Sequence, residues 1–394
     1  MSKGPLAGLQ VVELSAFVAV PLAGATLAGL GADVIRVDPV AGGIDIDRAP
    51  TWQGVSLYWA GLNAGKRSAG IDMRRPDGQE LVKKLAARAG NVITNLGVRG
   101  WNSYESLREA RPDLVMVVLS GAVDGSPAVD YTVNAGLGFP YVTGPEGHDG
   151  PVNHVLPAWD GMAGLTVATA LLAADRHRRD SGEGQLVELA LQDVGLAFTA
   201  QLGIFSEARL VPEPRGRYGN FVFGTFGKDF RTRDGKDLIL LALTPAQWRA
   251  LVKATGIEFE DLDGELEADE SARWRHRHAI AGRLQAWAGE RTLAECAARL
   301  DEQRALWRPF NTFKEAAAEP PANRVLADVE HPRIGRLAGA RSPLAFGAFP
   351  DQPVPQPPVL GQHTREVLSE LGLTAGEIAR LEREGVIGGA AARA

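Results

Sequence analysis

The chain has 394 residues, of which 45% are hydrophobic and 23% charged, and its formal net charge is −6. This length predicts about two or three domains and a large buried core. The negative balance argues against a nucleic-acid-binding surface, which needs a basic stripe, although a few local cations and helix N-termini can still hold an anionic ligand.

The number of cysteines and the N-terminal sequence indicate the cellular compartment. The single cysteine, Cys296, excludes a disulfide framework within the chain and leaves a catalytic thiol as a less favoured interpretation. The opening residues, MSKGPLAGLQ, lack the charged segment and apolar run of a signal peptide. The longest apolar stretch, 161–174, is too short to span a bilayer. We therefore expect a reduced, cytoplasmic compartment and no membrane partner.

Short apolar runs alternate with helical segments in the first part of the chain. The run LQVVEL at 9–14 predicts a strand, and an Ala/Leu/Gly-rich helix follows from Pro21 to Leu30, with Gly31 as its stop. Further predicted strands cover residues 33–37, 92–94 and 114–119, with a helix over 78–89. Strands and helices that alternate in this way predict a parallel, Rossmann-like sheet flanked by helices.

The character of the chain changes after about residue 205. Before that point, two helices are predicted at 161–179 and 186–202. Residues 211–235 are rich in Gly, Arg and aromatic side chains, and a strand at 238–243 and amphipathic helices to about residue 318 follow. Six prolines predict a loop over 341–358. A closing helix pair is predicted over 364–371 and 374–384, each opening on a threonine typical of an N-cap.

The opening β-α-β pattern raises the alternative of a dinucleotide-binding enzyme, with Asp38 as the ribose-binding acid. The first turn reads SAFVAVPLAG and lacks the G-x-G-x-x-G fingerprint, so a pyrophosphate has no close backbone approach. The sequence also has no G-x-S-x-G elbow, P-loop or zinc motif, and no histidine pair with metal-ligand spacing. We therefore expect neither a nicotinamide or flavin cofactor nor a metal.

Two short basic segments are candidate phosphate contacts. In LNAGKR, residues 62–67, Lys66 and Arg67 beside Gly65 offer two cations and open backbone. Arg99 follows the predicted strand at 92–94 and is a similar case. A solvated basic turn is the commoner explanation when spacing alone is considered, so both interpretations stay open.

Asp160 is the most informative single residue. It lies in VLPAWDGMAG at the start of an apolar helix, where the helix dipole and free N–H groups stabilise a carboxylate. An N-cap is the commoner role for such an aspartate. Gly161 and Gly164 leave the carboxylate open to a substrate, however, and carboxylate nucleophiles suit the exchange of a thioester. His154 is a further candidate, either as a general base or as a structural hydrogen-bonding group.

Taken in order, seven segments resemble the class III coenzyme A transferases, the family of formyl-CoA transferase, carnitine CoA-transferase and α-methylacyl-CoA racemase. They are PLAGLQVVEL, LAGLGADVIRVDP, LNAGKRSAGID, TNLGVRGW, the Asp160 segment, RRDSGEGQLVELALQDV and VLGQHTREVLSELGL. The resemblance implies an α/β fold, in which both chain ends (1–205 and 325–394) form a Rossmann-like large domain around an inserted, smaller α+β domain (206–324). It also implies an interlocked homodimer.

The resemblance assigns candidate site residues as well. Asp160 falls on the family's aspartate nucleophile. The positions that fall on the CoA site are Asn63, Gly65, Lys66, Asn95, Leu96 and Arg99, with Arg67 beside them. Val18 stands where formate- and oxalate-handling members have a glutamine, and Tyr131 stands where the racemase has its acid/base histidine. The implied substrate is an acyl-CoA, so that coenzyme A enters as part of the substrate and no separate cofactor is expected.

Within the family, one branch moves CoA between the two carboxyl groups of a single mesaconate (2-methylfumarate) molecule. The segments SAFVAVPLAG, WAGLNAGKRS, DYTVNAGLGFPYVTGP, VNHVLPAWD and GRYGNFVFGTFGKDF resemble that branch. We therefore expect an aspartyl anhydride and an aspartyl-CoA thioester as intermediates, and the Gly-rich loop 216–227 as a lid. The alternatives are an intermolecular CoA transferase between a dicarboxylic acyl-CoA and a free acid, a racemase, which Tyr131 disfavours, and a CoA-thioester-binding protein without catalysis.

Overall fold

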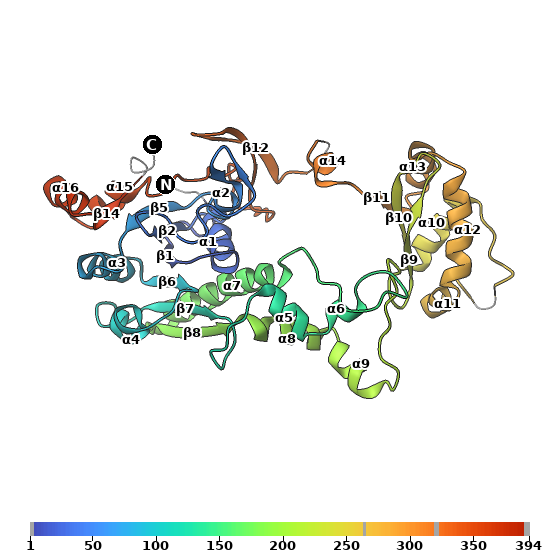
Figure 1. The fold of residues 1–394 in the computed structure, drawn as a ribbon, viewed down its shortest axis with the longest axis horizontal. Helices are drawn as coiled ribbons and strands as arrows, with labels where there is room; N and C mark the ends of the chain where they lie inside the picture. The colour runs from blue at the N-terminus through green and yellow to red at the C-terminus, as the bar shows by residue number, and fades with distance from the viewer. Residues whose placement is uncertain (1–3, 263–264, 319–322, 390–394) are drawn as a thin grey trace. The chain divides into compact units, whose positions relative to one another are not determined.

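The computed structural model describes residues 4–262, 265–318 and 323–389 (Figure 1). The chain divides into two units. The first comprises Met1–Leu137, Val155–Glu207 and Asn323–Ala394, and the second comprises Gly138–His154 and Ala208–Ala322. The expected division had the second part inserted as one segment, 206–324. In the structure this unit also takes in residues 138–154, which come from earlier in the chain.

A seven-stranded sheet with the order β14-β5-β2-β1-β6-β7-β8 forms the centre of the first unit. Its strands are β1 (Gln10–Leu14), β2 (Asp33–Asp38), β5 (Arg67–Ile71), β6 (Asn91–Thr94), β7 (Val115–Ser120), β8 (Gln185–Ala190) and β14 (Ile387–Gly388). Neighbouring strands are parallel throughout, except that β14 pairs with β5 in the antiparallel sense. The expected parallel-dominated α/β sheet is thus confirmed.

Helices cover both faces of this sheet, as α1 and α3 on opposite sides of the strands show in Figure 1. Apolar side chains from four helices pack on one face; these helices are α3 (Pro76–Ala89), α4 (Tyr104–Arg108), α15 (Thr364–Glu370) and α16 (Ala375–Arg383). The other face carries α1 (Ala19–Gly29) and α7 (Ala158–Ser181), which pack against each other. Gly164 permits this close packing, because a Cβ there would lie 2.6 Å from the Ala19 carbonyl oxygen.

One predicted helix was wrong. Residues 186–202 form not a single helix but β8 followed by α8 (Leu191–Gln201). β8 pairs in parallel with β7 and lies at the edge of the sheet. The physical reason is that a short apolar run such as LVELAL satisfies either periodicity, and the free edge of β7 selects the strand.

The two closing helices differ in how they begin. Thr374 caps α16 as predicted, since its hydroxyl accepts from the Glu377 N–H at 3.3 Å. Thr364 is instead the first residue of α15, with His363 in the cap position. The Thr364 hydroxyl accepts from the Gly70 N–H at 2.9 Å and lies 2.8 Å from the Gly388 carbonyl oxygen. It therefore fastens α15 to the sheet edge.

The second unit contains an antiparallel sheet of the order β11-β10-β9, built from β9 (Phe226–Arg231), β10 (Asp237–Ala242) and β11 (Leu306–Pro309). Its helices include α10 (Pro245–Thr255), α11 (Glu270–Arg275), α12 (Arg277–Gly289) and α13 (Leu293–Glu302). Side chains of the sheet and the helices share one apolar core, in which Phe226, Trp248 and Leu284 are buried. This is the α+β composition expected for the inserted domain.

The remaining elements connect these parts. They are β3 (Thr51–Trp52), β4 (Val55–Ser56), α2 (Leu57–Leu62), η1 (Gly100–Asn102), α5 (Asp130–Gly136), α6 (Phe139–Val142), α9 (Ile204–Leu210), α14 (Phe313–Ala318), β12 (Leu326–His331) and β13 (Gly335–Ala340). Residues 341–358 form a loop, as the prolines predicted. In the part of the chain that the structure describes, no helix is long and apolar enough to cross a membrane.

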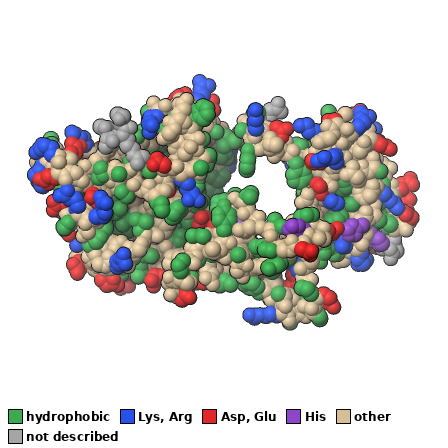
Figure 2. Space-filling view, in the orientation of Figure 1, with side chains coloured by type: hydrophobic (Ala, Val, Ile, Leu, Met, Phe, Trp, Pro, Cys, Tyr) green, Lys and Arg blue, Asp and Glu red, His purple; other side chains and the backbone are tan. Residues whose placement is uncertain are grey.

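Acidic and basic side chains are interspersed over α3, α15 and α16 in the space-filling view (Figure 2). Ion pairs link several of them, including Arg365 with Glu382 at 2.5 Å and Arg88 with Glu370 at 3.3 Å. A mixed surface of this kind gives no basic stripe for a nucleic acid on these helices.

Candidate active site

A cavity of about 570 Å³ in the first unit opens beside the N-terminus of α7. Its lining comes from the turn between β1 and α1, from the segment before α2, from the carboxyl ends of β6 and β7, and from the first turns of α5 and α7. The side chains used below are Phe17, Val18, Arg48, Tyr58, Tyr131 and Asp160. The carboxyl edge of a parallel sheet is where α/β proteins bind ligands, and this volume suits a small molecule.

Asp160 lies in the first turn of α7 but does not cap it. Pro157 occupies the N-cap position, and Asp160 is the third helical residue. The capping is done by Asp130, whose Oδ2 accepts from the backbone N–H groups of Trp159 at 2.7 Å and Asp160 at 3.0 Å. The Asp160 carboxylate itself makes no hydrogen bond or ion pair with the residues that the structure describes, so that it faces the cavity as an unpaired group.

The environment of Asp160 makes it a stronger base than an ordinary aspartate. Burial, and after it the negative charge of Asp130, raises the pKa of Asp160 to about 6, while Arg48 acts in the opposite direction. The group is therefore mostly ionised at neutral pH, yet it is poorly stabilised as an anion. A carboxyl group with a raised pKa in a cavity is typical of an active site.

The turn between β1 and α1 forms one wall of the cavity. The Asn95 side-chain amide ties this turn to the end of β6, accepting from the Ala16 N–H at 3.0 Å and donating to the Ala16 carbonyl at 2.8 Å. The Phe17 N–H donates to Asp45 Oδ2 at 3.2 Å, and Phe17 has a φ of 65°. These two anchors hold Val18, the residue before α1, against the cavity.

Four of the sequence-predicted site residues meet at this cavity, namely Val18, Asn95, Tyr131 and Asp160. The Tyr131 hydroxyl donates to the Val155 carbonyl at 3.4 Å, and the side chain is 42% exposed. Tyr131 thus stands at the rim. Of the two glycines expected to keep Asp160 open, Gly161 has no neighbour that a Cβ would meet, whereas Gly164 packs against α1.

Lys66 and Asn63 lie elsewhere, in a buried polar cluster. Lys66 Nζ donates to Glu13 Oε1, the Pro21 carbonyl and Asn63 Oδ1, each at 2.8 Å, and its side chain is fully buried. Burial lowers the pKa of Lys66 to about 8, and Glu13 offsets part of that effect. In place of the expected phosphate contact, three protein acceptors thus take up the ammonium group.

Arg36 completes this cluster. Its guanidinium donates to Asp38 Oδ1 at 2.7 Å, to Asp45 Oδ2 at 3.0 Å and to Asn63 Oδ1 at 3.0 Å. The other Asp38 oxygen accepts from the Ser68 hydroxyl at 2.6 Å. Asp38, the residue considered as a ribose-binding acid, is therefore engaged within the protein, while Asp45 links the cluster to the Phe17 turn.

The other expected CoA contacts differ in their availability. Arg67 is surrounded by Asp33, Glu366 and Glu370 at 2.6, 3.1 and 2.8 Å, which neutralise its charge. The Gly65 N–H donates to the Gln356 carbonyl, and Leu96 packs on the apolar core. Arg99 is exposed and forms no ion pair with the described residues, so its guanidinium is accessible to an anion.

Two other candidates fall outside the cavity. His154 belongs to the second unit and does not line the cavity. Cys296 lies in the core of that unit, where burial raises the pKa of its thiol to about 11. A thiol with such a pKa stays protonated at neutral pH, which argues against a nucleophilic cysteine.

Sequence reasoning missed Arg48, Tyr58 and Asp130. The Arg48 guanidinium carbon lies 5.3 Å from the ring centres of both Phe17 and Tyr58. Burial raises the pKa of Tyr58 to about 12, and its buried hydroxyl has no partner among the described residues. No motif marks these residues, because each acquires its role only through segments distant in sequence.

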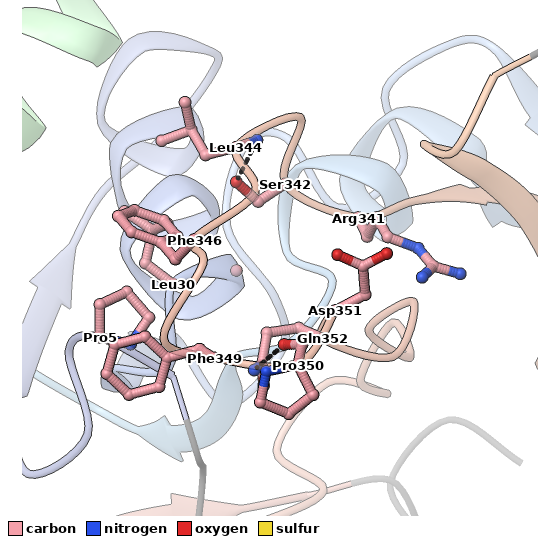
Figure 3. A pocket seen from close by; sticks show the side chains of 11 residues that line it. Pro5, Leu30, Arg341, Ser342, Leu344, Phe346, Phe349, Pro350, Asp351 and Gln352 are labelled. Carbon is pink, nitrogen blue, oxygen red and sulfur yellow. Dashed lines mark hydrogen bonds between the residues drawn. The ribbon is translucent and has the colours of Figure 1, made fainter.

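A second hollow in the first unit lies between Leu30 and the loop that carries Phe346 and Phe349 (Figure 3). Its volume is about 20 Å³, enough for little more than a water molecule. It cannot admit an acyl group. Among the described residues, no group of three or more His, Cys, Asp or Glu side chains is placed to hold a metal ion.

The sequence model of CoA-transferase family III matches residues 6–364, and the chain belongs to this family. Within the family, it is 50% identical over 403 aligned positions to 2-methylfumaryl-CoA isomerase of Chloroflexus aurantiacus, covering 98% of both chains. It is also 31% identical to succinate–glutarate CoA-transferase of Agrobacterium fabrum, covering 94% of this chain and 96% of the relative.

Solved structures agree with the family assignment. A CAIB/BAIF family protein from Brucella suis superimposes with a TM-score of 0.79 and 27% identity, covering 94% of this chain and 100% of that one. The family and the fold thus support the interpretation of the cavity beside Asp160 as a site for thioester chemistry.

Proposed function

We propose that the protein is an intramolecular CoA transferase that converts 2-methylfumaryl-CoA into 3-methylfumaryl-CoA, with Asp160 as the nucleophile. This proposal rests above all on the Asp160 carboxylate, which faces the cavity without a hydrogen bond to the described residues and has a pKa raised to about 6. Membership of CoA-transferase family III supports thioester exchange, and 50% identity to a 2-methylfumaryl-CoA isomerase supports the acyl group.

The reaction proceeds through four acyl exchanges. An Asp160 oxygen attacks the thioester carbonyl and expels CoA thiolate, which gives a mixed anhydride. The thiolate attacks the aspartyl carbonyl, leaving an aspartyl-CoA thioester and 2-methylfumarate dianion. The other carboxylate then attacks the aspartyl carbonyl and expels the thiolate again. Attack of the thiolate on the substrate-side carbonyl of the new anhydride releases 3-methylfumaryl-CoA and free Asp160, so that no water or net proton is consumed.

Retention of the diacid distinguishes this reaction from intermolecular transfer. A carboxylate held beside the aspartyl carbonyl has a high effective concentration, and a site closed to water protects the anhydride. We include the loop 216–227 as the lid, an interlocked homodimer as the working assembly and the cytoplasm as its location. These three stay predictions. The loop lies in the second unit, where Tyr218 and Phe223 stack with ring centres 5.6 Å apart.

The test is an isotope experiment with mesaconyl-CoA and a large excess of labelled free mesaconate. We expect CoA to move to the other carboxyl group while little label enters the thioester pool, because the released diacid reattacks before it escapes. Chromatography with mass spectrometry measures both quantities in one sample.

Each rival function predicts a different result. In the same assay, labelling at nearly the rate of CoA migration would identify an intermolecular transferase and remove the isomerase proposal. A racemase would leave mesaconyl-CoA unchanged, because its α-carbon carries no hydrogen, and would instead exchange the α-proton of a saturated branched acyl-CoA with deuterated water in a second incubation. No turnover of any thioester would leave a binding protein.

A further inference from the structure

Arg48 is a cation in the Asp160 cavity that is held by aromatic rings. Its guanidinium lies over the faces of Phe17 and Tyr58, on two separate segments, with 5.3 Å to each ring centre. No hydrogen bond or ion pair joins its guanidinium to the residues that the structure describes. Arg36 and Arg67, in the same unit, are held differently, since each contacts at least two carboxylates.

Stacking on ring faces leaves the hydrogen-bonding edge of a guanidinium free. The attraction between a cation and a ring acts through the flat faces, whereas the N–H donors point outward in the plane of the group. Arg48 is therefore oriented by Phe17 and Tyr58 without losing its donors. Such a preorganised fork suits a carboxylate, which can accept two parallel hydrogen bonds from it.

The position of Arg48 relative to Asp160 identifies the carboxylate concerned. Both line the same cavity, and Arg48 lies near enough to act against the rise in the pKa of Asp160. When a dicarboxylic thioester reacts with Asp160, one end is bonded and the other keeps its negative charge. In the cavity Arg48 is the side chain placed and equipped to hold that charge.

We propose that Arg48 binds the free carboxylate of the dicarboxylic acyl-CoA and so determines specificity for diacids over monoacids. This inference rests on the proposed function and deepens it. Because each of the two mixed anhydrides leaves one carboxylate of the diacid free, Arg48 can hold that carboxylate before and after CoA changes position. It thereby keeps the released dianion beside Asp160.

The experiment compares the binding of two thioesters that differ only in this carboxylate. One is 2-methylfumaryl-CoA, and the other is the 2-methylbut-2-enoyl thioester of the same double-bond geometry, in which a methyl group replaces the carboxylate. Both are titrated by calorimetry into Asp160→Asn, which binds without turnover, and into Asp160→Asn combined with Arg48→Gln. We expect Kd for the diacid thioester to rise about tenfold to a hundredfold, the range of a charge-assisted hydrogen bond, and Kd for the methyl analogue to change by less than about twofold.

Further variants separate binding from folding. Arg48→Lys keeps the charge but loses the planar fork, so we expect an intermediate Kd for the diacid thioester alone. Arg176→Gln is the matched control, because Arg176 lies on α7 with an 86% exposed side chain. An equal loss of affinity for both thioesters, or no loss for either, overturns the inference. If the parent protein binds the diacid thioester but never moves CoA, the proposed function fails while the Kd comparison still decides the role of Arg48.

Discussion

The carboxylate of Asp130 accepts a hydrogen bond from the backbone N–H of Asp160 at 3.0 Å. One aspartate thus fixes the helical turn that carries the other. Burial is the larger cause of the raised pKa of Asp160, and like-charge repulsion from Asp130 adds to it. The two acidic groups have separate roles. Asp130 accepts hydrogen bonds from backbone N–H groups at the helix N-terminus, and Asp160 stays available for chemistry.

Replacing Asp130 by asparagine should shift the pH dependence of turnover. Asp160 reacts as an anion, so kcat/KM rises with pH through its pKa of about 6. Removing the neighbouring charge lowers that pKa, and the acid limb of the profile should therefore move to lower pH. Profiles between about pH 4.5 and 8 for the parent protein, for Asp130→Asn and for the control Asp180→Asn, on the exposed end of α7, measure the shift. An acid limb shared by all three proteins would contradict this account.

Asp160→Asn should be inactive yet more stable at neutral pH. The amide cannot form an anhydride, so no more than about a hundredth of the parent rate should remain. Because burial raises the pKa of Asp160 from 3.8 to about 6, ionised Asp160 destabilises the folded state above pH 6. Its partial exposure reduces the effect to about 1–2 kcal/mol.

The stability gain of Asp160→Asn should depend on pH. The gain should fade as the pH drops from about 6 through the ordinary pKa of 3.8, because well below pH 3.8 the carboxyl group is protonated in both the folded and the unfolded state. Urea unfolding at several pH values measures it. A gain that is the same at pH 4 and pH 7 would point to packing and not to charge.

Lys66→Met should affect folding before it affects substrate binding. The substitution removes the nearer of two cations from the buried Glu13 and leaves Arg36 Nη1 at 3.7 Å from Glu13 Oε1. Breaking a buried ion pair costs about 3–5 kcal/mol, and we expect the lower end because Arg36 remains. Combining it with Glu13→Gln should restore part of the lost stability, because the uncompensated charge is removed. Denaturant unfolding of the two single variants and the double variant measures this coupling. If Lys66→Met were fully stable but had a raised KM that varied with salt, Lys66 would belong to the CoA site.

Arg99→Ala should instead act on substrate affinity. Its guanidinium is exposed and forms no ion pair within the described residues, so a CoA phosphate can pair with it. Losing one such contact should raise KM about tenfold to a hundredfold with little change in stability. The KM of the variant should also vary less with ionic strength, since one screened attraction is gone. Arg74→Ala is the control, as Arg74 is 90% exposed and, among the described residues, pairs only with Asp72. Equal KM values in the two variants would exclude the contact.

The sequence allowed the strands of the large unit to be predicted where apolar runs end at turn residues. Residues 9–14 and 33–37 were predicted as strands, and the structure has Gln10–Leu14 and Asp33–Asp38. The prediction failed at 186–202, where the run is short enough to suit both periods and the decision depends on the neighbouring strand β7. The local sequence pattern predicts the secondary structure only where tertiary contacts do not decide between a helix and a strand.

The candidate site could be predicted only in part, for a related reason. Asp160 stood out because a helix start carries its own local signal. Lys66 was interpreted either as a phosphate contact or as part of a solvated turn, since its sequence neighbours do not reveal Glu13, which lies 53 positions away and meets it across the fold. Arg48 gave no signal at all, because Phe17 and Tyr58 surround it only after three segments converge.

The edge of the large sheet has a consequence for biosynthesis. β14, at residues 387–388, pairs with β5, whereas β1 at the centre of that sheet comes from residues 10–14. A ribosome therefore makes β5 (Arg67–Ile71) long before β14, so β5 carries an unpaired edge throughout that interval. Open strand edges are sites at which nascent chains pair wrongly with one another. Until residues 387–388 emerge, the newly made protein carries a temporary aggregation hazard at β5 that the finished fold removes.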